Sequence, residues 1–394
     1  MQQPATVFSQ ITDVLYPAEF DRCVQLFPTA RSPRALTYYD QFLALCFGQL
    51  TYRESLRDIV SCLRAQRASL YHLGFRGEIS RTNLAYANHH RDWRLFEAIA
   101  QILMRRAARL YGHQDGDPEL PKVAFALDSS MISLSLKLFP WGYYARSTQA
   151  AVKLHLMLSL QGNLPAWAAI TEAHFQDMRI LDRVPAVAGA YYVMDRGYLD
   201  FLRLRRLHQV GSFFVIRSKH HVRFAVSTSR PVDKSTGLRC DQTIRLTTRW
   251  SKRFYPEALR RIRLYDAENE ITLVFLTNQF DLPAQTIAEL YRKRWQVELF
   301  FKWIKQHLRL RAFYGRSQNA VRSQIWSAIC AYLMVAIVRK VINSQKTLNE
   351  ILQIVSVNIF DQVPLSQLLA VNPETWTPET ETCEAQKLLS LNGL

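Results

Sequence analysis

Two aspartates in this sequence follow apolar runs that have the length and composition of buried β-strands. Asp128 comes directly after Val123–Leu127, and Asp195 comes directly after Tyr191–Met194. Groups at strand ends of an α/β sheet converge on one edge, where ligands bind. A single Asp after a strand indicates little, because Asp is common in turns. Two such aspartates together with a third acid on a helix form a more specific pattern.

The third acid, Glu298, lies in an otherwise basic stretch. From Tyr291 to Arg322 the chain has nine Lys or Arg residues and one acid. At about 100° per residue, four side chains of this stretch fall on one stripe of a helix: Tyr291, Arg294, Glu298 and Lys305. Arg294 and Glu298 alone would be an i,i+4 ion pair that only stabilises a helix. With the two strand-end aspartates, we interpret Glu298 as a functional carboxylate.

Three carboxylates without a Cys or His cluster suit Mg²⁺ or Mn²⁺, which prefer oxygen ligands. Two such ions about 3.5–4 Å apart can activate an attacking oxygen and stabilise a leaving oxygen in phosphodiester chemistry. Arg294 and Lys305 lie one and two turns from Glu298, where cations can hold phosphates beside the scissile bond. We therefore predict that Asp128, Asp195 and Glu298 are the catalytic metal ligands.

The charge of the chain indicates a polyanionic partner. Among 394 residues, 50 Lys and Arg stand against 33 Asp and Glu, so the net charge is +17. Nucleic acid is the first candidate and an anionic membrane the second. From residue 341 onward two basic and six acidic residues give −4, so the first 340 residues carry +21. The polyanion site is expected upstream of residue 341.

Hydrophobic periodicity divides the chain into five segments. Residues 1–112 predict a helical, DNA-binding domain, with helix starts after Thr51 and Ser80; short helix–turn–helix patterns are common, so a purely structural role is also open. Residues 121–210 predict three strands in meander order and then further strand and helix, and 211–280 predict a β-rich segment. Residues 281–345 include a long helix from Ile287 to about Leu308, and 346–394 form a helical or loosely ordered tail.

The sequence disfavours a disulfide-bonded, secreted or membrane-associated protein. The six cysteines form no CxxC pattern, which is typical of reduced, buried thiols in a cytosolic protein. The first ten residues do not read as a signal peptide. The apolar run Ile325–Val338 is shorter than a membrane span and predicts a buried core helix. A membrane-surface role fails because no basic amphipathic helix has a spare apolar face.

Four further short motifs have smaller expected roles. Ser129 and Ser130 are expected in a turn, because no Gly-x-Ser-x-Gly surrounds them. The pair His220–His221 is expected in a solvated or phosphate-contacting loop. Two residues that flank Asp195 are expected to shape the site: Arg196 and Tyr198. Two cations at the end of the next strand are expected to contact DNA: Arg217 and Lys219.

The spacing Tyr291-x2-Arg294-x3-Glu298-x6-Lys305 resembles the YREK signature of the insertion sequence 4 (IS4) family of DDE transposases. Asp128 in ALDSS and Asp195 in VMDRGY resemble the two aspartates of that family. The separations of 67 residues from 128 to 195 and 103 residues from 195 to 298 are similar to those of members with a β-rich domain inserted before the glutamate helix. The resemblance covers about Lys122 to Arg322.

This resemblance implies an α/β fold: an RNase H-like catalytic core with an inserted β-rich domain and an N-terminal all-helical domain. The first strand would carry Asp128, the fourth Asp195, and a late helix Glu298. Family members use Mg²⁺ or Mn²⁺ to nick DNA at the inverted-repeat ends and then use the freed 3′-OH to attack target DNA. The resemblance also implies that Tyr291, Arg294 and Lys305 bind DNA beside the cleavage site.

Some members of the family pass through a DNA hairpin, and an aromatic residue of the inserted domain then stacks on a flipped base. Trp250 is the candidate for that role here, because it lies among Arg and Lys residues. A Trp predicted on a strand is also often a core residue or a platform for an Arg side chain, and both readings are open.

The resemblance implies DNA as the partner, both inverted-repeat transposon ends and target DNA, and no membrane. It also implies a dimer in the synaptic complex, because joining two ends requires two active sites. We expect a bacterial cytoplasmic protein associated with the nucleoid. One alternative is an RNase H-like nuclease or resolvase without strand transfer. Another, a transposase-derived DNA-binding protein, is disfavoured by the presence of all three acids.

Overall fold

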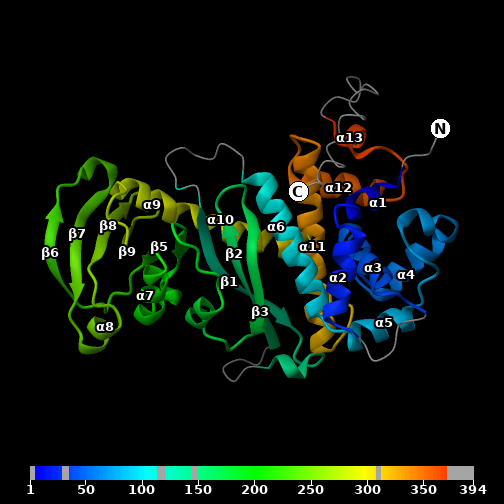
Figure 1. The fold of residues 1–394 in the computed structure, drawn as a ribbon, viewed down its shortest axis with the longest axis horizontal. Coiled ribbons are helices and arrows are strands. Elements are labelled where there is room, and N and C mark those ends of the chain that lie inside the picture. Colours follow the sequence, from blue (N-terminus) through cyan, green and yellow to red (C-terminus); the bar gives the residue numbers. More distant parts are fainter. Residues whose placement is uncertain are drawn as a thin grey trace. The chain divides into compact units, whose positions relative to one another are not determined.

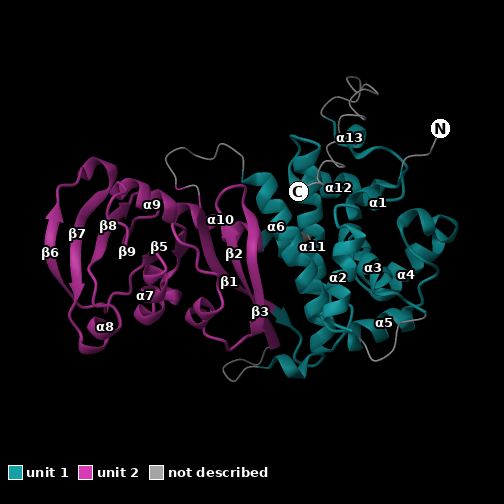
Figure 2. Cartoon of the chain, in the orientation of Figure 1, with its two compact units in different colours: residues 1–113, 133–143, 302–394 teal, residues 114–132, 144–301 magenta. Residues whose placement is uncertain are grey.

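A computed structural model describes residues 5–28, 35–112, 121, 123–143, 150–307 and 312–370. The chain divides into two compact units, which Figure 2 colours separately. Unit 1 comprises residues 1–113, 133–143 and 302–394, and unit 2 comprises 114–132 and 144–301. The segment 281–345, which the sequence assigns to one part of the catalytic core, is thus shared between the two units.

Unit 1 is built from helices at both ends of the chain. In chain order they are α1 (Val7–Thr12), α2 (Pro17–Leu26), α3 (Tyr38–Leu50), α4 (Leu56–Ala65), the 3₁₀ turns η1 (Arg67–Ser69) and η2 (Tyr71–Leu73), α5 (Arg81–His90), α6 (Arg94–Tyr111), the 3₁₀ turn η3 (Pro140–Gly142), α11 (Gln318–Val341), α12 (Leu348–Asn358) and α13 (Leu365–Leu368). The predicted start after Ser80 is confirmed, because its side chain caps α5. The predicted start after Thr51 is wrong: Thr51 ends α3, Tyr52 has a positive φ of 57°, and Ser55 caps α4.

Helix α11 is the core of unit 1. It is long and apolar enough to cross a membrane, but 94% of its most apolar window is buried within the protein. The predicted core helix is therefore confirmed. A helix that is apolar on every side needs neighbours on every side. Helices α5 and α6 supply part of them: Asn319 on α11 donates to the Asn88 carbonyl 2.9 Å away, and the Tyr111 hydroxyl donates to the Ala336 carbonyl at 2.9 Å.

Unit 2 is organised around a nine-stranded sheet in the order β3-β2-β1-β4-β5-β9-β8-β7-β6 (Figure 1). The strands are β1 (Ala124–Leu134), β2 (Ala150–Ser159), β3 (Leu164–Glu172), β4 (Tyr191–Met194), β5 (Phe213–Arg217), β6 (Phe224–Arg230), β7 (Leu238–Leu246), β8 (Leu259–Asp266) and β9 (Ile271–Thr277). All predicted strands are present. β4 pairs in parallel with β1 and β5, and the pairs from β5 through β9, β8 and β7 to β6 are antiparallel. The predicted β-rich segment therefore extends the same sheet.

Apolar clusters cover both faces of the central strands. Tyr192 and Met194 of β4 belong to one cluster, and Tyr191 and Val193 belong to the other. This burial on both faces explains why β4 reads as a continuous apolar run instead of an alternating one. The remaining elements of unit 2 are η4 (Asp177–Asp182), η5 (Arg196–Tyr198), α7 (Phe201–Gln209), η6 (Lys234–Thr236), α8 (Arg249–Phe254), α9 (Ala284–Lys293) and the first part of α10 (Trp295–His307).

The long helix predicted from Ile287 to about Leu308 is interrupted. Helix α9 ends at Lys293, Arg294 is its C-cap, and α10 begins at Trp295. The Arg294 amide donates to the Tyr291 carbonyl at 3.1 Å, and the Val297 amide donates to the Arg294 carbonyl at 3.0 Å. These three-residue bonds are of the 3₁₀ type, which tightens the chain between two α-helices. Leu308 lies outside the described residues.

Candidate active site

The register of two parallel strands brings the aspartates together. β1 and β4 pair as far as Leu127 opposite Met194. Asp128 is the next residue of β1 and Asp195 is the first residue after β4, so both follow the paired region at the same level. The expectation that Asp128 ends its strand is wrong, because β1 continues to Leu134. Ser129 and Ser130 consequently lie in β1 and not in the expected turn.

Arg294 joins Asp128 to Glu298. Its Nη1 lies 2.8 Å from Oδ2 of Asp128, and its Nη2 lies 2.6 Å from Oε1 of Glu298. The Arg294 side chain is only 12% exposed, against 19% for Asp128 and 33% for Glu298. The i,i+4 pair with Glu298 was expected from spacing. The pair with Asp128 was not, because no local pattern connects residues that are 166 positions apart.

Tyr291 contacts Asp195, the acid that Arg294 does not bind in the ion pairs above. Its hydroxyl donates to Oδ1 of Asp195 at 3.1 Å, and the Cζ atom of Arg294 lies 5.5 Å from the centre of its ring. Burial raises the pKa of Tyr291 to about 12, so the hydroxyl keeps its proton and remains a donor at neutral pH. Two residues at the α9–α10 junction, Tyr291 and Arg294, therefore contact all three acids.

The three acids and Arg294 together carry excess negative charge. Burial raises the pKa of Asp128 to about 6, and the nearby charges of Glu298 and Asp195 add to this effect. The Ser129 amide, 2.8 Å from Oδ1 of Asp128, and the Arg294 guanidinium oppose it without cancelling it. Arg294 thus pairs with two of the three carboxylates, and carboxylate oxygens are the ligands that Mg²⁺ and Mn²⁺ prefer.

The described residues do not form a ready-made metal cage. Among them, no group of three or more His, Cys, Asp or Glu side chains is arranged to hold a metal ion. At Asp128 and Glu298, the Arg294 guanidinium occupies one oxygen of each carboxylate. The donor chemistry fits a divalent cation, which would compete with Arg294 for these oxygens.

Lys305 lies on α10, two turns beyond Glu298, in the part of the helix that belongs to unit 1. It is half-buried, and burial lowers its pKa. Its contact with DNA phosphates stays a prediction.

Trp250 lies on the short helix α8 and not on a strand as expected. It is 62% exposed, so the reading as a core residue is wrong. Its ring stacks on Phe254 with centroids 6.0 Å apart, and the Cζ atom of Arg253 lies 6.0 Å from its centre. The reading as an Arg platform thus agrees with the structure, and it leaves most of the ring accessible.

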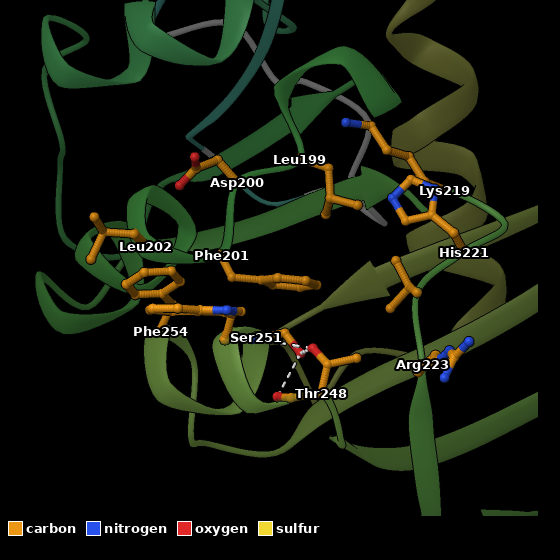
Figure 3. Close-up of a pocket in the computed structure, with 12 residues that line it drawn as sticks. Leu199, Asp200, Phe201, Leu202, Lys219, His221, Arg223, Thr248, Ser251 and Phe254 are labelled. Atoms are coloured by element: carbon orange, nitrogen blue, oxygen red, sulfur yellow. Dashed lines mark hydrogen bonds between the residues drawn. The ribbon is translucent and has the colours of Figure 1, made fainter.

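Trp250 lines a pocket of about 480 Å³. The pocket has an apolar part from Leu199, Phe201, Leu202 and Phe254, and a basic part from Lys219, His221 and Arg223. Figure 3 shows Phe201 between Leu202 and Phe254 on one side and the three basic residues on the other. His220 and His221 lie in the exposed turn that follows β5, as expected. The pocket itself has no signal in the sequence, because its lining comes from three separate segments, 199–202, 219–223 and 248–254.

The expectation of buried thiols holds for three of the described cysteines. Cys23, Cys46 and Cys330 are free and buried, whereas Cys62 and Cys240 are free and only partly buried. Cys383 lies outside the described residues.

Comparison with known proteins identifies families for two regions. Residues 119–334 match the transposase DDE domain family, and residues 3–76 match a domain of unknown function, DUF4372. The first match includes Asp128, Asp195 and Glu298.

Three relatives are transposases by name. A putative transposase, y4zB, of Sinorhizobium fredii is 34% identical over 215 residues, which are 54% of this chain and 59% of that protein. A probable transposase for insertion sequence element IS5377 of Geobacillus stearothermophilus is 31% identical over 54% of this chain and 56% of that protein. A putative transposase for insertion sequence element IS4SA of Synechocystis is 24% identical over 68% of this chain and 75% of that protein. The chain thus matches less than two thirds of the length of the first two.

The match to the family model extends over 216 of the 394 residues and includes all three acids. This chain therefore belongs to the DDE transposase family.

Proposed function

We propose that this protein is the transposase of an IS4-like insertion sequence, which binds terminal inverted repeats and cuts and joins DNA by metal-dependent phosphoryl transfer. The observation that carries the proposal is the meeting of Asp128 and Glu298 on one guanidinium, with Asp195 beside them on Tyr291. The similarity to the named IS4SA transposase supports the assignment to an IS4-like element.

The strand order supports an RNase H-like core. Strands β3-β2-β1-β4-β5 are consecutive in the sheet, β1 and β4 are parallel, and they carry the two aspartates at the same level. This order agrees with the expectation that the first and fourth strands carry the aspartates. The strands β6–β9 would then be the family's inserted β-rich segment.

In this proposal Asp128, Asp195 and Glu298 bind Mg²⁺ or Mn²⁺, since DDE transposase domains generally use divalent metals. The bound metal would activate the attacking oxygen and stabilise the leaving oxygen at phosphorus. Tyr291 orients Asp195 by its hydrogen bond. Arg294 holds Asp128 and Glu298 close together and can turn toward a phosphate when a cation takes over these acids. Lys305 would bind a neighbouring phosphate.

DNA binding is also proposed for the N-terminal helices. Helix α5 contains no acidic residue, and it exposes Arg81, Tyr86, His89 and His90. A helix that exposes an arginine together with polar and aromatic side chains, and that has no acid, fits the electrostatics of DNA. Joining of two ends to target DNA would require a dimer in the synaptic complex. The expected setting is the bacterial cytoplasm, at the nucleoid.

Trp250 is proposed to stack on an unpaired base. Its exposed ring, its apolar neighbours and the cations Lys219 and Arg223 form a surface on which a base and its phosphate fit together. Trp250→Phe should keep base stacking and Trp250→Ala should lose it. Fluorescence of 2-aminopurine placed at the end of the transposon DNA measures the difference. Equal fluorescence in both variants would contradict this role.

The deciding experiment is Mg²⁺-dependent cleavage of a labelled end duplex by wild type and by Glu298→Gln. The variant should not cut, and wild-type cutting by the variant would refute the assignment. Glu289→Gln on α9 is the matched control, since Glu289 contacts Gln285 and none of the three acids in the described part of the chain. Scoring joined products separately from nicked products tests the alternative of a nuclease without strand transfer.

A further inference from the structure

A second group of polar side chains lies next to Asp128 in unit 2: Ser129, Lys153 and Asp177. Asp177 begins η4, shortly after β3, and its Oδ1 accepts a hydrogen bond from the Ser129 hydroxyl at 2.7 Å. Lys153 on β2 donates to the same oxygen at 3.0 Å and to the Phe175 carbonyl at 2.8 Å. These bonds tie three separate segments together: β1, β2 and the turn before η4.

Ser129 links this group to the acid cluster through two of its own atoms. Its backbone amide donates to Oδ1 of Asp128 at 2.8 Å, while its side chain is held by Asp177. The other oxygen of Asp128 faces Arg294. The orientation of the Asp128 carboxylate is therefore set on one side by Ser129 and on the other by Arg294.

At Ser129 the strand β1 has left one of its two neighbours. Pairing of β1 with β4 stops at Leu127 opposite Met194, while β2 remains the other neighbour of β1 in the strand order. The side-chain bond from Ser129 to Asp177 adds a link to η4 where the pairing with β4 has ended. Tyr198 is buried beside this group: it is 2% exposed, and its hydroxyl lies near Ser129, Asp128 and Asp177.

We propose that Ser129 and Asp177 are positioning residues, which fix the Asp128 carboxylate in the orientation that a divalent cation needs. Lys153 neutralises Asp177, which lies outside the group that Arg294 and Tyr291 gather, so Asp177 supports the site without being one of its ligands. The inference rests on the proposed metal-dependent function of Asp128. Outer groups that orient a ligand typically change metal affinity by about 10–100-fold when they are removed.

The test is a Mn²⁺ titration of the full chain, with and without an end duplex, followed by the electron paramagnetic resonance signal of free Mn²⁺. Ser129→Ala and Asp177→Ala should raise the Mn²⁺ dissociation constant by about tenfold. The Mg²⁺ concentration that gives half-maximal cleavage should rise in parallel. Ser129→Thr keeps the hydroxyl, and Asp177→Asn keeps an acceptor for it, so both should bind Mn²⁺ nearly as wild type does.

Ser159→Ala is the matched control, because the Ser159 hydroxyl donates only to the Gln161 carbonyl among the bonds that the structure describes. The denaturant midpoint of each variant reports loss of folding, which alone would lower the amount of active protein and leave the Mn²⁺ dissociation constant unchanged. Wild-type Mn²⁺ affinity in Ser129→Ala would overturn the inference, as would an equal loss in Asp177→Asn and Asp177→Ala.

Glu298→Gln separates this inference from the proposed function. If Glu298→Gln keeps both Mn²⁺ affinity and cleavage, the proposed function fails. If it loses both while Ser129→Ala keeps both, only the positioning role fails.

Discussion

Two of the clusters of unit 2 in which arginine meets carboxylate have opposite balances of charge. In the acidic cluster, one arginine, Arg294, pairs with Asp128 and Glu298, and Asp195 lies beside them. The basic cluster consists of Asp241, Arg230 and Arg260. Arg260 holds Asp241 through two bonds of 2.9 and 2.7 Å, and Arg230 adds a third at 3.2 Å.

The pKa values of Asp128 and Asp241 are shifted in opposite directions from the ordinary value of an aspartate. Burial alone would raise the pKa of Asp241, but its bonds and charge interactions with Arg260 and Arg230 outweigh burial and lower it. For Asp128, burial and two neighbouring acids outweigh a single arginine and raise the pKa to about 6. In the basic cluster the arginines outnumber the acid, so its charges neutralise one another in a structural ion pair. In the acidic cluster the acids outnumber the arginine, so negative charge remains that a metal cation can bind.

Arg260 shows the structural role of the basic cluster. Besides Asp241, it donates to the carbonyls of Gln279, Phe280 and Leu282, at 3.4, 3.3 and 2.5 Å. These carbonyls lie in the connection between β9 and α9. The side chain thus anchors the chain just before the helix that carries Tyr291.

The largest expected effect comes from removing a charge of the acidic cluster. Asp128→Asn should lower metal-dependent DNA cleavage by on the order of 100- to 1,000-fold, the range for loss of a preorganised electrostatic group. The free energy of unfolding without metal should stay the same or rise, because a buried like-charge contact is relieved. Cleavage rates and denaturant unfolding of the same preparation measure both. If Asp128→Asn folds stably and cleaves DNA as fast as wild type, the acidic cluster has no catalytic role that distinguishes it from the basic cluster.

The corresponding change in the basic cluster should affect stability instead. Asp241→Asn leaves Arg260 buried without its counter-charge, and breaking a buried pair in this way costs about 3 kcal/mol of unfolding free energy. Cleavage per folded molecule should remain near wild type. Urea denaturation gives the first quantity, and active-site titration before the cleavage assay gives the second. Lost cleavage in fully folded Asp241→Asn would show that the cluster also acts in catalysis.

The two aspartates should also differ in their response to pH. Metal binding requires ionised Asp128, so Mn²⁺ affinity should fall by about tenfold per pH unit below pH 6. A raised carboxyl pKa means that the ionised form opposes folding. The stability advantage of Asp128→Asn over wild type should therefore be full above pH 6 and disappear as the pH falls toward 4. Asp241, with its lowered pKa, stays ionised over this range. Mn²⁺ titrations and urea unfolding at pH 5, 6 and 7 test both trends.

The smallest effect concerns a cation of α10 beyond the acidic cluster. Lys305→Ala should weaken DNA binding and reduce the slope of log affinity against log salt by about one, because one phosphate contact is lost. The folded state should be little affected. Fluorescence anisotropy of a labelled end duplex at several salt concentrations measures the slope. An unchanged slope would exclude Lys305 as a phosphate contact and leave Arg294 as the main cation of the site.

Much of this architecture could be predicted from local patterns. The strands around Asp128 and Asp195, the five strands between residues 213 and 277, and the buried helix α11 follow from runs and periodicities of apolar residues. Those patterns report burial directly, since each element must cover its apolar face. The type of chemistry also follows from sequence, because three acids in a strongly basic chain suit a metal and a polyanion.

The arrangement of the site depended on contacts between distant segments. The break at Arg294 aims one guanidinium at both Asp128 and Glu298, and no local signal marks it. Ser129 reaches Asp177 only because β1 passes close to the turn before η4. Trp250 is exposed on a short helix where the local pattern indicated a strand.

Sequence by itself determined which side chains are available and which segments are buried, because both are properties of a residue and its near neighbours. Tertiary structure decided which charges face one another. Their energies depend on distance and burial, and both are set by elements that lie far apart along the chain.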